Sequence, residues 1–143
     1  MKTVNPQSAL AAIAVASLCA CSGVLDPPGE GQQPGVISFY NDPVVVEAPE
    51  TVVRGQTFTV SVRTYGGGCI TQGPTGVRVD DLLATVTPMD INSGANVCTA
   101  ELRMFRHEAS IRFDRAGTAT VVLRGTRLPE DEPVTVLRTI TVL

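Results

Sequence analysis

The sequence predicts an all-β protein that forms a single antiparallel β-sandwich of about seven strands. Three observations support this fold class. Apolar and polar residues alternate with a period of two in several short runs, as in strands that bury one face. Gly, Pro, Asn and Asp residues separate these runs and indicate turns. No segment carries a convincing helical stripe of apolar residues.

Three runs show the alternation most clearly. Apolar side chains occupy the even positions of 56–64 (QTFTVSVRT) and the odd positions of 105–113 (FRHEASIRF) and 118–125 (TATVVLRG). Further strands rich in Val, Ile and Thr are expected at 36–40, 44–47, 84–88 and 134–142. The expected domain, 36–143, has 108 residues, which is enough for one hydrophobic core and not for two.

Residues 1–20 resemble the leader of a bacterial lipoprotein. Lys2 supplies a positive charge, and the small and apolar run 9–18 is too short to span a bilayer, which takes about twenty apolar residues. The junction 18–21 (LCAC) resembles the lipobox, where the lipoprotein signal peptidase cuts before an obligatory cysteine. The resemblance implies removal of the leader and lipidation of Cys21. The alternative is an ordinary secretory leader that leaves this thiol free.

Residues 21–35 are expected to be the lipidated cysteine and a flexible tether. The segment 22–35 (SGVLDPPGEGQQPG) contains three prolines and four glycines, and it has almost no apolar side chains to offset its chain entropy. By the same resemblance, acyl chains on Cys21 would anchor the protein to a membrane. Ser22 rather than Asp at the next position favours the outer membrane. The expected location is therefore the bacterial cell envelope.

The lipoprotein interpretation also partitions the four cysteines. Cys19 leaves with the leader and Cys21 carries the lipid, so Cys69 and Cys98 remain as a pair. In an exported protein such a pair is more typical of a disulfide than of a metal or redox site, since the chain has no C-x-x-C motif and one histidine. We therefore expect one disulfide between Cys69 and Cys98.

Two sequence units and the expected disulfide resemble immunoglobulin-like domains of exported bacterial proteins. The units are G-x-x-F-x-V-x-V at 55–62 and A-G-x-A-x-V-x-L-x-G at 116–125, and the resemblance extends over 44–143. Two features of antibody-type domains are missing, because the chain has no Trp and Ala119 stands where a tyrosine corner would be. The resemblance implies a sandwich whose loops carry recognition.

Candidate catalytic and metal-binding residues are few. His107 shares a strand face with Ala109 and Ile111, so we expect a hydrogen-bonded strand residue rather than a catalytic base. Residues 90–96 (DINSGAN) resemble a calcium loop, but Gly94 stands where a ligand is needed and no Glu closes the loop, which favours a polar turn. The prediction is therefore no catalytic residue, no metal and no cofactor.

Glu130, Asp131 and Glu132 form an acidic cluster in the loop between the last two predicted strands. One interpretation is a solvated hairpin tip, and the other is a contact loop for a partner. The glycine-rich segment 66–76 is a second candidate contact patch.

Charge argues against a nucleic-acid partner. After removal of the leader, ten arginines face fourteen acidic residues, a formal net charge of −4, and no basic cluster is present. Two function classes remain: a membrane-anchored binding or scaffolding domain, and a structural subunit of a larger envelope assembly that pairs through a sheet edge. An enzyme ranks third, and the sequence names no ligand.

Overall fold

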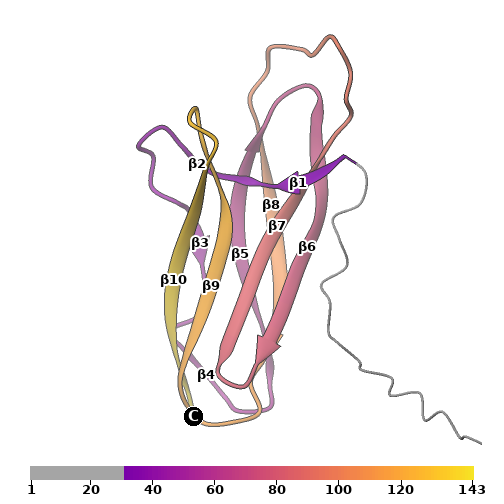
Figure 1. Cartoon of the computed structure of the whole chain (residues 1–143). Coiled ribbons are helices and arrows are strands. Elements are labelled where there is room, and N and C mark those ends of the chain that lie inside the picture. The colour runs from indigo at the N-terminus through magenta and orange to yellow at the C-terminus, as the bar shows by residue number, and fades with distance from the viewer. Residues whose placement is uncertain (1–30) are drawn as a thin grey trace, which may run out of the picture.

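The computed structural model describes residues 31–143, which are built from β-strands (Figure 1). The strands are β1 (Gln32–Pro34), β2 (Val36–Phe39), β3 (Val46–Glu47), β4 (Thr51–Val52), β5 (Thr57–Gly66), β6 (Ile70–Asp80), β7 (Leu83–Asn92), β8 (Arg103–Arg112), β9 (Gly117–Leu128) and β10 (Glu132–Val142). The predicted all-β class is confirmed, with ten strands rather than about seven because β1, β4 and β6 were not expected. Among the described residues, no helix has the length and hydropathy needed to cross a membrane.

Backbone pairing joins the ten strands into one mixed sheet centred on β9. β9 pairs antiparallel with β10 along its length, and its other edge pairs in parallel with β7 and β2. β5 pairs antiparallel with β8 and β3, and β2 links β5 to β9. The expectation of a wholly antiparallel sheet was wrong, since β10 also pairs in parallel with β4.

The path of the chain explains the parallel pair of β7 and β9. β8 follows β7 but pairs with β5, so the chain crosses to the other group of strands before it returns as β9. The chain reverses direction between β7 and β8 and again between β8 and β9, so β9 runs parallel to β7. Alternation in sequence predicts which face of a strand is buried, but it does not show whether the neighbouring strand is parallel or antiparallel.

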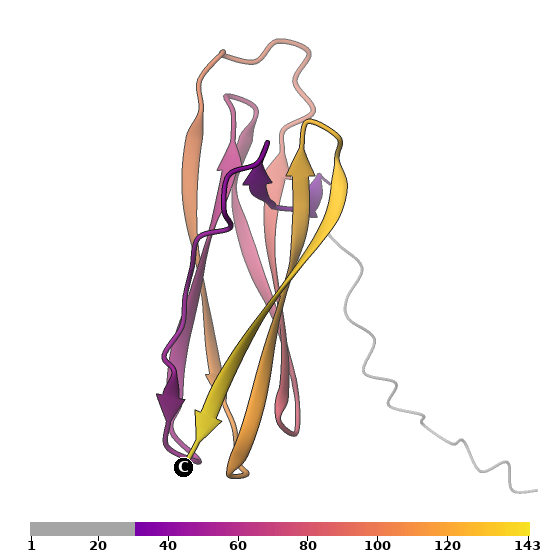
Figure 2. The ribbon, with the colours of Figure 1, turned by 90° about the vertical axis from the view of Figure 1, so that its left-hand side faces the viewer.

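The hydrophobic core lies between two groups of strands. The sheet folds over on itself, so that β5 and β8 face β7, β9 and β10 (Figure 2). The buried side chains that meet there include Ile37, Val60, Val62, Ala84, Val86, Ala109, Ile111, Phe113, Ala119, Val121, Leu123 and Ile140. The predicted inward faces of residues 105–113 and 118–125 are therefore confirmed.

Two strands lie where the sequence indicated loop or tether. β6 contains Gly73, Pro74 and Gly76, which weaken a strand prediction, but Pro is tolerated at a sheet edge and among the described residues β6 pairs only with β7. β1 pairs with β7 within the segment expected to be a tether, so the ordered fold begins before Val36.

The predicted disulfide between Cys69 and Cys98 is confirmed, with 5.2 Å between the two Cα atoms. Cys69 lies in the connection between β5 and β6, and Cys98 lies in the loop 93–102 between β7 and β8. The bond therefore ties two connecting segments at one end of the domain and does not cross the core.

Candidate functional site

A cavity of about 660 Å³ is lined in part by β1. Figure 1 shows that β1 crosses the sheet at one end of the domain. We call this cavity the end cleft. Its lining comprises Gln33, Pro34, Val36, Phe39, Tyr65, Gly66, Gly67, Ile70, Glu101, Leu102, Thr126, Leu128 and Asp131. These residues come from β1, β2, the β5–β6 connection, the loop 93–102 and the β9–β10 hairpin. Segments distant in sequence thus build one site.

The disulfide connects two walls of the end cleft. Cys69 adjoins the wall formed by the β5–β6 connection, and Cys98 lies in the loop that provides the neighbouring wall with Glu101 and Leu102. Gly68 N also donates a hydrogen bond to Thr99 O across 3.3 Å. A Cβ atom on Gly68 would lie 2.6 Å from Thr99 N, so glycine is required for this close approach.

Aromatic and aliphatic side chains make up most of the cleft wall. The rings of Phe39 and Tyr65 have centroids 6.0 Å apart, and Tyr40 packs edge-on against Phe39 with centroids 4.8 Å apart. Leu102, on the disulfide-bonded loop, is 64% exposed. Leu102 therefore adds exposed apolar surface at the edge of the cleft.

Two carboxylates lie in the cleft lining, and no Lys, Arg or His does. Glu101 accepts hydrogen bonds from Thr99 Oγ1 at 2.9 Å and from Arg103 at 2.5 Å. The Thr99 hydroxyl, followed by the Arg103 guanidinium, lowers the pKa of Glu101 below its ordinary value. Asp131 stands at the tip of the β9–β10 hairpin with a left-handed φ of 54°, a conformation that Asp tolerates. The cleft therefore carries negative charge at neutral pH.

The structure brings only part of each predicted contact patch into the lining of the end cleft. Of the acidic cluster, Asp131 lines the end cleft, whereas Glu130 and Glu132 are exposed beside it. Of the segment 66–76, the first residues and Ile70 line the cleft, and the remainder forms β6. Contact by either patch stays a prediction, but both now lie at the same cavity.

His107 is a hydrogen-bonded strand residue, as predicted, and it is 0% exposed. Its Nε2 atom lies 3.1 Å from Asp90 Oδ1, and its Nδ1 atom lies 3.2 Å from Thr75 Oγ1. The three residues come from β8, β7 and β6, so the group joins three strands through side chains. The order hydroxyl, imidazole, carboxylate resembles a nucleophilic triad. However, both the ring and the carboxylate are buried, so the group is placed to hold strands together.

Asp90 was missed as a partner of His107 by the sequence analysis. It was considered only as a residue of the polar turn, because the strand at 84–88 was expected to end at Pro88. In the structure β7 continues to Asn92, and Asp90 shares the buried face of Ala84 and Val86. The continued period of two was the indication that could have placed Asp90 inside.

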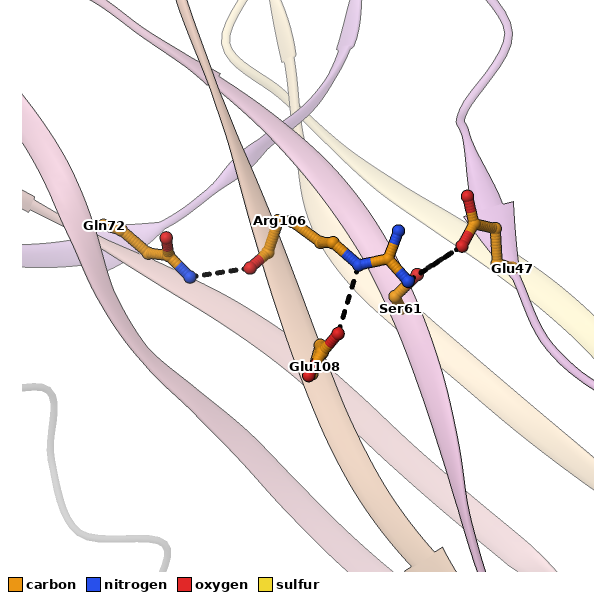
Figure 3. Close-up of polar contacts among 5 residues, drawn as sticks. All are labelled: Glu47, Ser61, Gln72, Arg106 and Glu108. Atoms are coloured by element: carbon orange, nitrogen blue, oxygen red, sulfur yellow. Dashed lines mark hydrogen bonds and ion pairs between the residues drawn. The ribbon is translucent and has the colours of Figure 1, made fainter.

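A second polar group lies on the outer face of β5 and β8 (Figure 3). Arg106 contacts Glu47 at 2.9 Å and Glu108 at 3.1 Å, and Ser61 Oγ donates to Glu47 across 3.2 Å. Arg106 lowers the pKa of Glu47, while Glu108 and Glu47 raise the pKa of Arg106. Gln72 on β6 donates to Arg106 O at 2.7 Å, which bridges two strands that share no backbone pairing.

This outer network borders a shallow hollow of about 260 Å³. The Arg106 guanidinium already has two carboxylate partners, so it has no uncompensated charge to offer an anionic ligand. The network fastens β3 and β6 to β8, and it is a poor candidate for a binding site.

The expected polar turn at 90–96 is only partly present, because residues 90–92 belong to β7 and the chain leaves the strand only after Asn92. There Asn92 Oδ1 accepts a hydrogen bond from Gly94 N at 3.0 Å. Within 31–143 no cluster of three or more His, Cys, Asp or Glu side chains is arranged to hold a metal ion. Cys21, the predicted lipidation site, lies outside the described residues. Comparisons with protein-family models, with curated proteins and with solved structures return no match for this chain.

Proposed function

We propose that the chain is a lipid-anchored, non-enzymatic binding protein of the bacterial cell envelope, and that the end cleft is its binding site. The observation that carries this proposal is the cleft itself. It combines an apolar wall with a charged rim, and a disulfide ties two of its walls together. A cavity lined by apolar groups with a few placed polar groups is the usual form of a binding site.

The polar groups outside the cleft support a binding role over an enzymatic one. His107 is enclosed by its hydrogen-bond partners, and Arg106 is compensated by two carboxylates. Neither group faces the end cleft. A general base needs access to the proton that it removes, which a fully buried imidazole lacks.

The position of Gly31 supports a tethered arrangement. Gly31 O accepts a hydrogen bond from Asn92 N at 2.8 Å, and Gln33 and Pro34 of the adjoining β1 line the cleft. Ten chain steps separate Cys21 from Gly31, and they reach at most about 35 Å. A lipid on Cys21 would hold the cleft near the membrane, so the partner would be another component at that surface.

Capture from chemically crosslinked envelopes tests the binding role. The full chain and two variants, Leu102→Ser in the cleft and Leu83→Ser near the opposite end of the domain, are compared for crosslinked partners. Both leucines are exposed, so neither change should unfold the domain. We expect Leu102→Ser to abolish the captured species and Leu83→Ser to leave it unchanged. Equal capture by both variants would refute the assignment of the cleft.

Mass spectrometry of the mature N-terminus tests the anchor separately. We expect an acylated Cys21 as the first residue. An unmodified N-terminus at any other position would remove the anchor from the proposal and leave the cleft to be judged by the crosslinking result.

A second candidate function, a structural subunit of an envelope assembly, has one observation in its favour. Val77 and Val79 on β6 are 37% and 41% exposed, although they pair with the buried Val86 and Ala84 and share their face. A sheet edge with apolar side chains can accept a strand from a partner. A constant, stoichiometric partner lost on Val79→Lys but kept on Leu102→Ser would favour this candidate.

A further inference from the structure

We infer that the end cleft binds a peptide segment of a partner protein in which a Lys or Arg side chain stands next to apolar side chains. This inference rests on the proposed binding function and gives its ligand a chemical class.

The apolar part of the ligand follows from the cleft wall. Phe39 and Tyr65 form an aromatic pair on one side, and Leu102 and Leu128 add aliphatic surface. Because Leu102 is 64% exposed, a partner side chain that covers it removes apolar surface from water. An apolar side chain of the ligand would therefore lie against this wall.

The basic part of the ligand follows from the charges. Glu101 shares its carboxylate with Arg103, but the Asp131 carboxylate has no ion pair or hydrogen bond within residues 31–143. Glu130 and Glu132 flank Asp131 and are exposed, so the hairpin tip adds three negative charges at one rim. A cation in the cleft would meet these carboxylates, and the Phe39 and Tyr65 rings could receive it on their faces.

Other ligand classes fit the cleft less well. Aliphatic side chains outnumber aromatic ones in the lining, whereas a sugar is best held by exposed aromatic platforms. The acidic hairpin tip would be repelled by anionic lipid headgroups. A peptide satisfies both the apolar wall and the acidic rim.

Selection from a phage-displayed library of random heptapeptides on the immobilised full chain tests the inference. We expect the selected peptides to be enriched in Lys or Arg adjacent to Leu, Ile or Phe. A selection with no basic enrichment, or binding to a glycan array in place of peptides, would overturn the inference.

A charge exchange then tests the site. One selected peptide and its copy with Glu in place of the basic residue are measured by fluorescence anisotropy. We expect the Glu copy to bind the unmodified chain at least about tenfold more weakly, and Asp131→Arg to reverse that preference. Asp80→Arg, near the opposite end of the domain, is the matched control and should change neither affinity. An unchanged preference in Asp131→Arg would place the cation elsewhere and overturn the inference.

The crosslinking result separates the two proposals. If capture depends on Leu102 but the selected peptides show no basic residue, only the ligand class is wrong. If capture is also independent of Leu102, the binding function assigned to the cleft is wrong as well.

Discussion

Replacing His107 with Ala should destabilise the domain more than any surface change. His107 is 0% exposed and Asp90 is 1% exposed, so the pair is fully shielded from water. The substitution removes the imidazole and leaves Asp90 Oδ1 without its partner, while Oδ2 already has no hydrogen-bond partner among the described residues. An uncompensated carboxylate would then remain in the core.

The magnitude follows from this uncompensated group. Removing one member of a buried, hydrogen-bonded pair costs about 3–5 kcal/mol, because the other member keeps its desolvation cost. Small domains have free energies of unfolding of about 5–15 kcal/mol. We therefore expect His107→Ala to remove a third or more of the stability of an average domain.

Urea unfolding monitored by circular dichroism measures the effect. The variants are His107→Ala, Asp90→Ala and the double variant, together with Thr75→Val as a control that removes only the hydroxyl partner. We expect the double variant to be more stable than the sum of the single effects predicts, by at least about 1 kcal/mol, since the residues are in contact. Additive single effects, or a loss under about 1 kcal/mol for His107→Ala, would refute this account of the pair.

Two further predictions concern the covalent and ionic links. The Cys69–Cys98 bridge spans 29 residues, so the variant with both cysteines changed to Ala should lose about 3–4 kcal/mol in denaturant unfolding. Unchanged stability would contradict this prediction and would indicate that the unfolded chain has little conformational freedom even without the disulfide. Arg106 lowers the folded-state pKa of Glu47 below 4.5, so their pairing stabilises the fold above that pH, and this contribution is lost as pH falls through the lowered value. Between pH 7 and pH 3 the free energy of unfolding of the unmodified chain should therefore fall by more than that of the Glu47→Gln variant. Equal decreases would contradict the lowered pKa of Glu47.

Local alternation predicted the interior of the long strands correctly. Ala109 and Ile111 in β8 and Val121 and Leu123 in β9 are buried as their parity indicated, because parity depends only on neighbouring residues. Ser61 shows where this reasoning ends. It lies on the outer face that its parity predicted, yet it is buried, because β3 pairs beside it and Glu47 lies against its hydroxyl.

The end cleft could be predicted only in part. The cysteines indicated one link between its walls, and the loop compositions marked Asp131 and the glycine-rich segment as candidate contacts. The cavity arises because β2, β5 and the β9–β10 hairpin end together, which depends on the pairing of β2 with both β5 and β9 that no local pattern encodes. The immunoglobulin-like resemblance and the lipid on Cys21 remain predictions.

The central place of β9 has a consequence for how the chain folds. β2 and β7 both take β9 as a neighbour, although about 80 residues of chain separate β2 from β9. A chain made from its N-terminus cannot complete the core until β9 emerges, and contacts so distant in sequence form slowly. Until then the apolar faces of β5, β7 and β8 stay uncovered and prone to aggregation. A protein of this topology is therefore more exposed to aggregation during synthesis than a helical bundle of equal size.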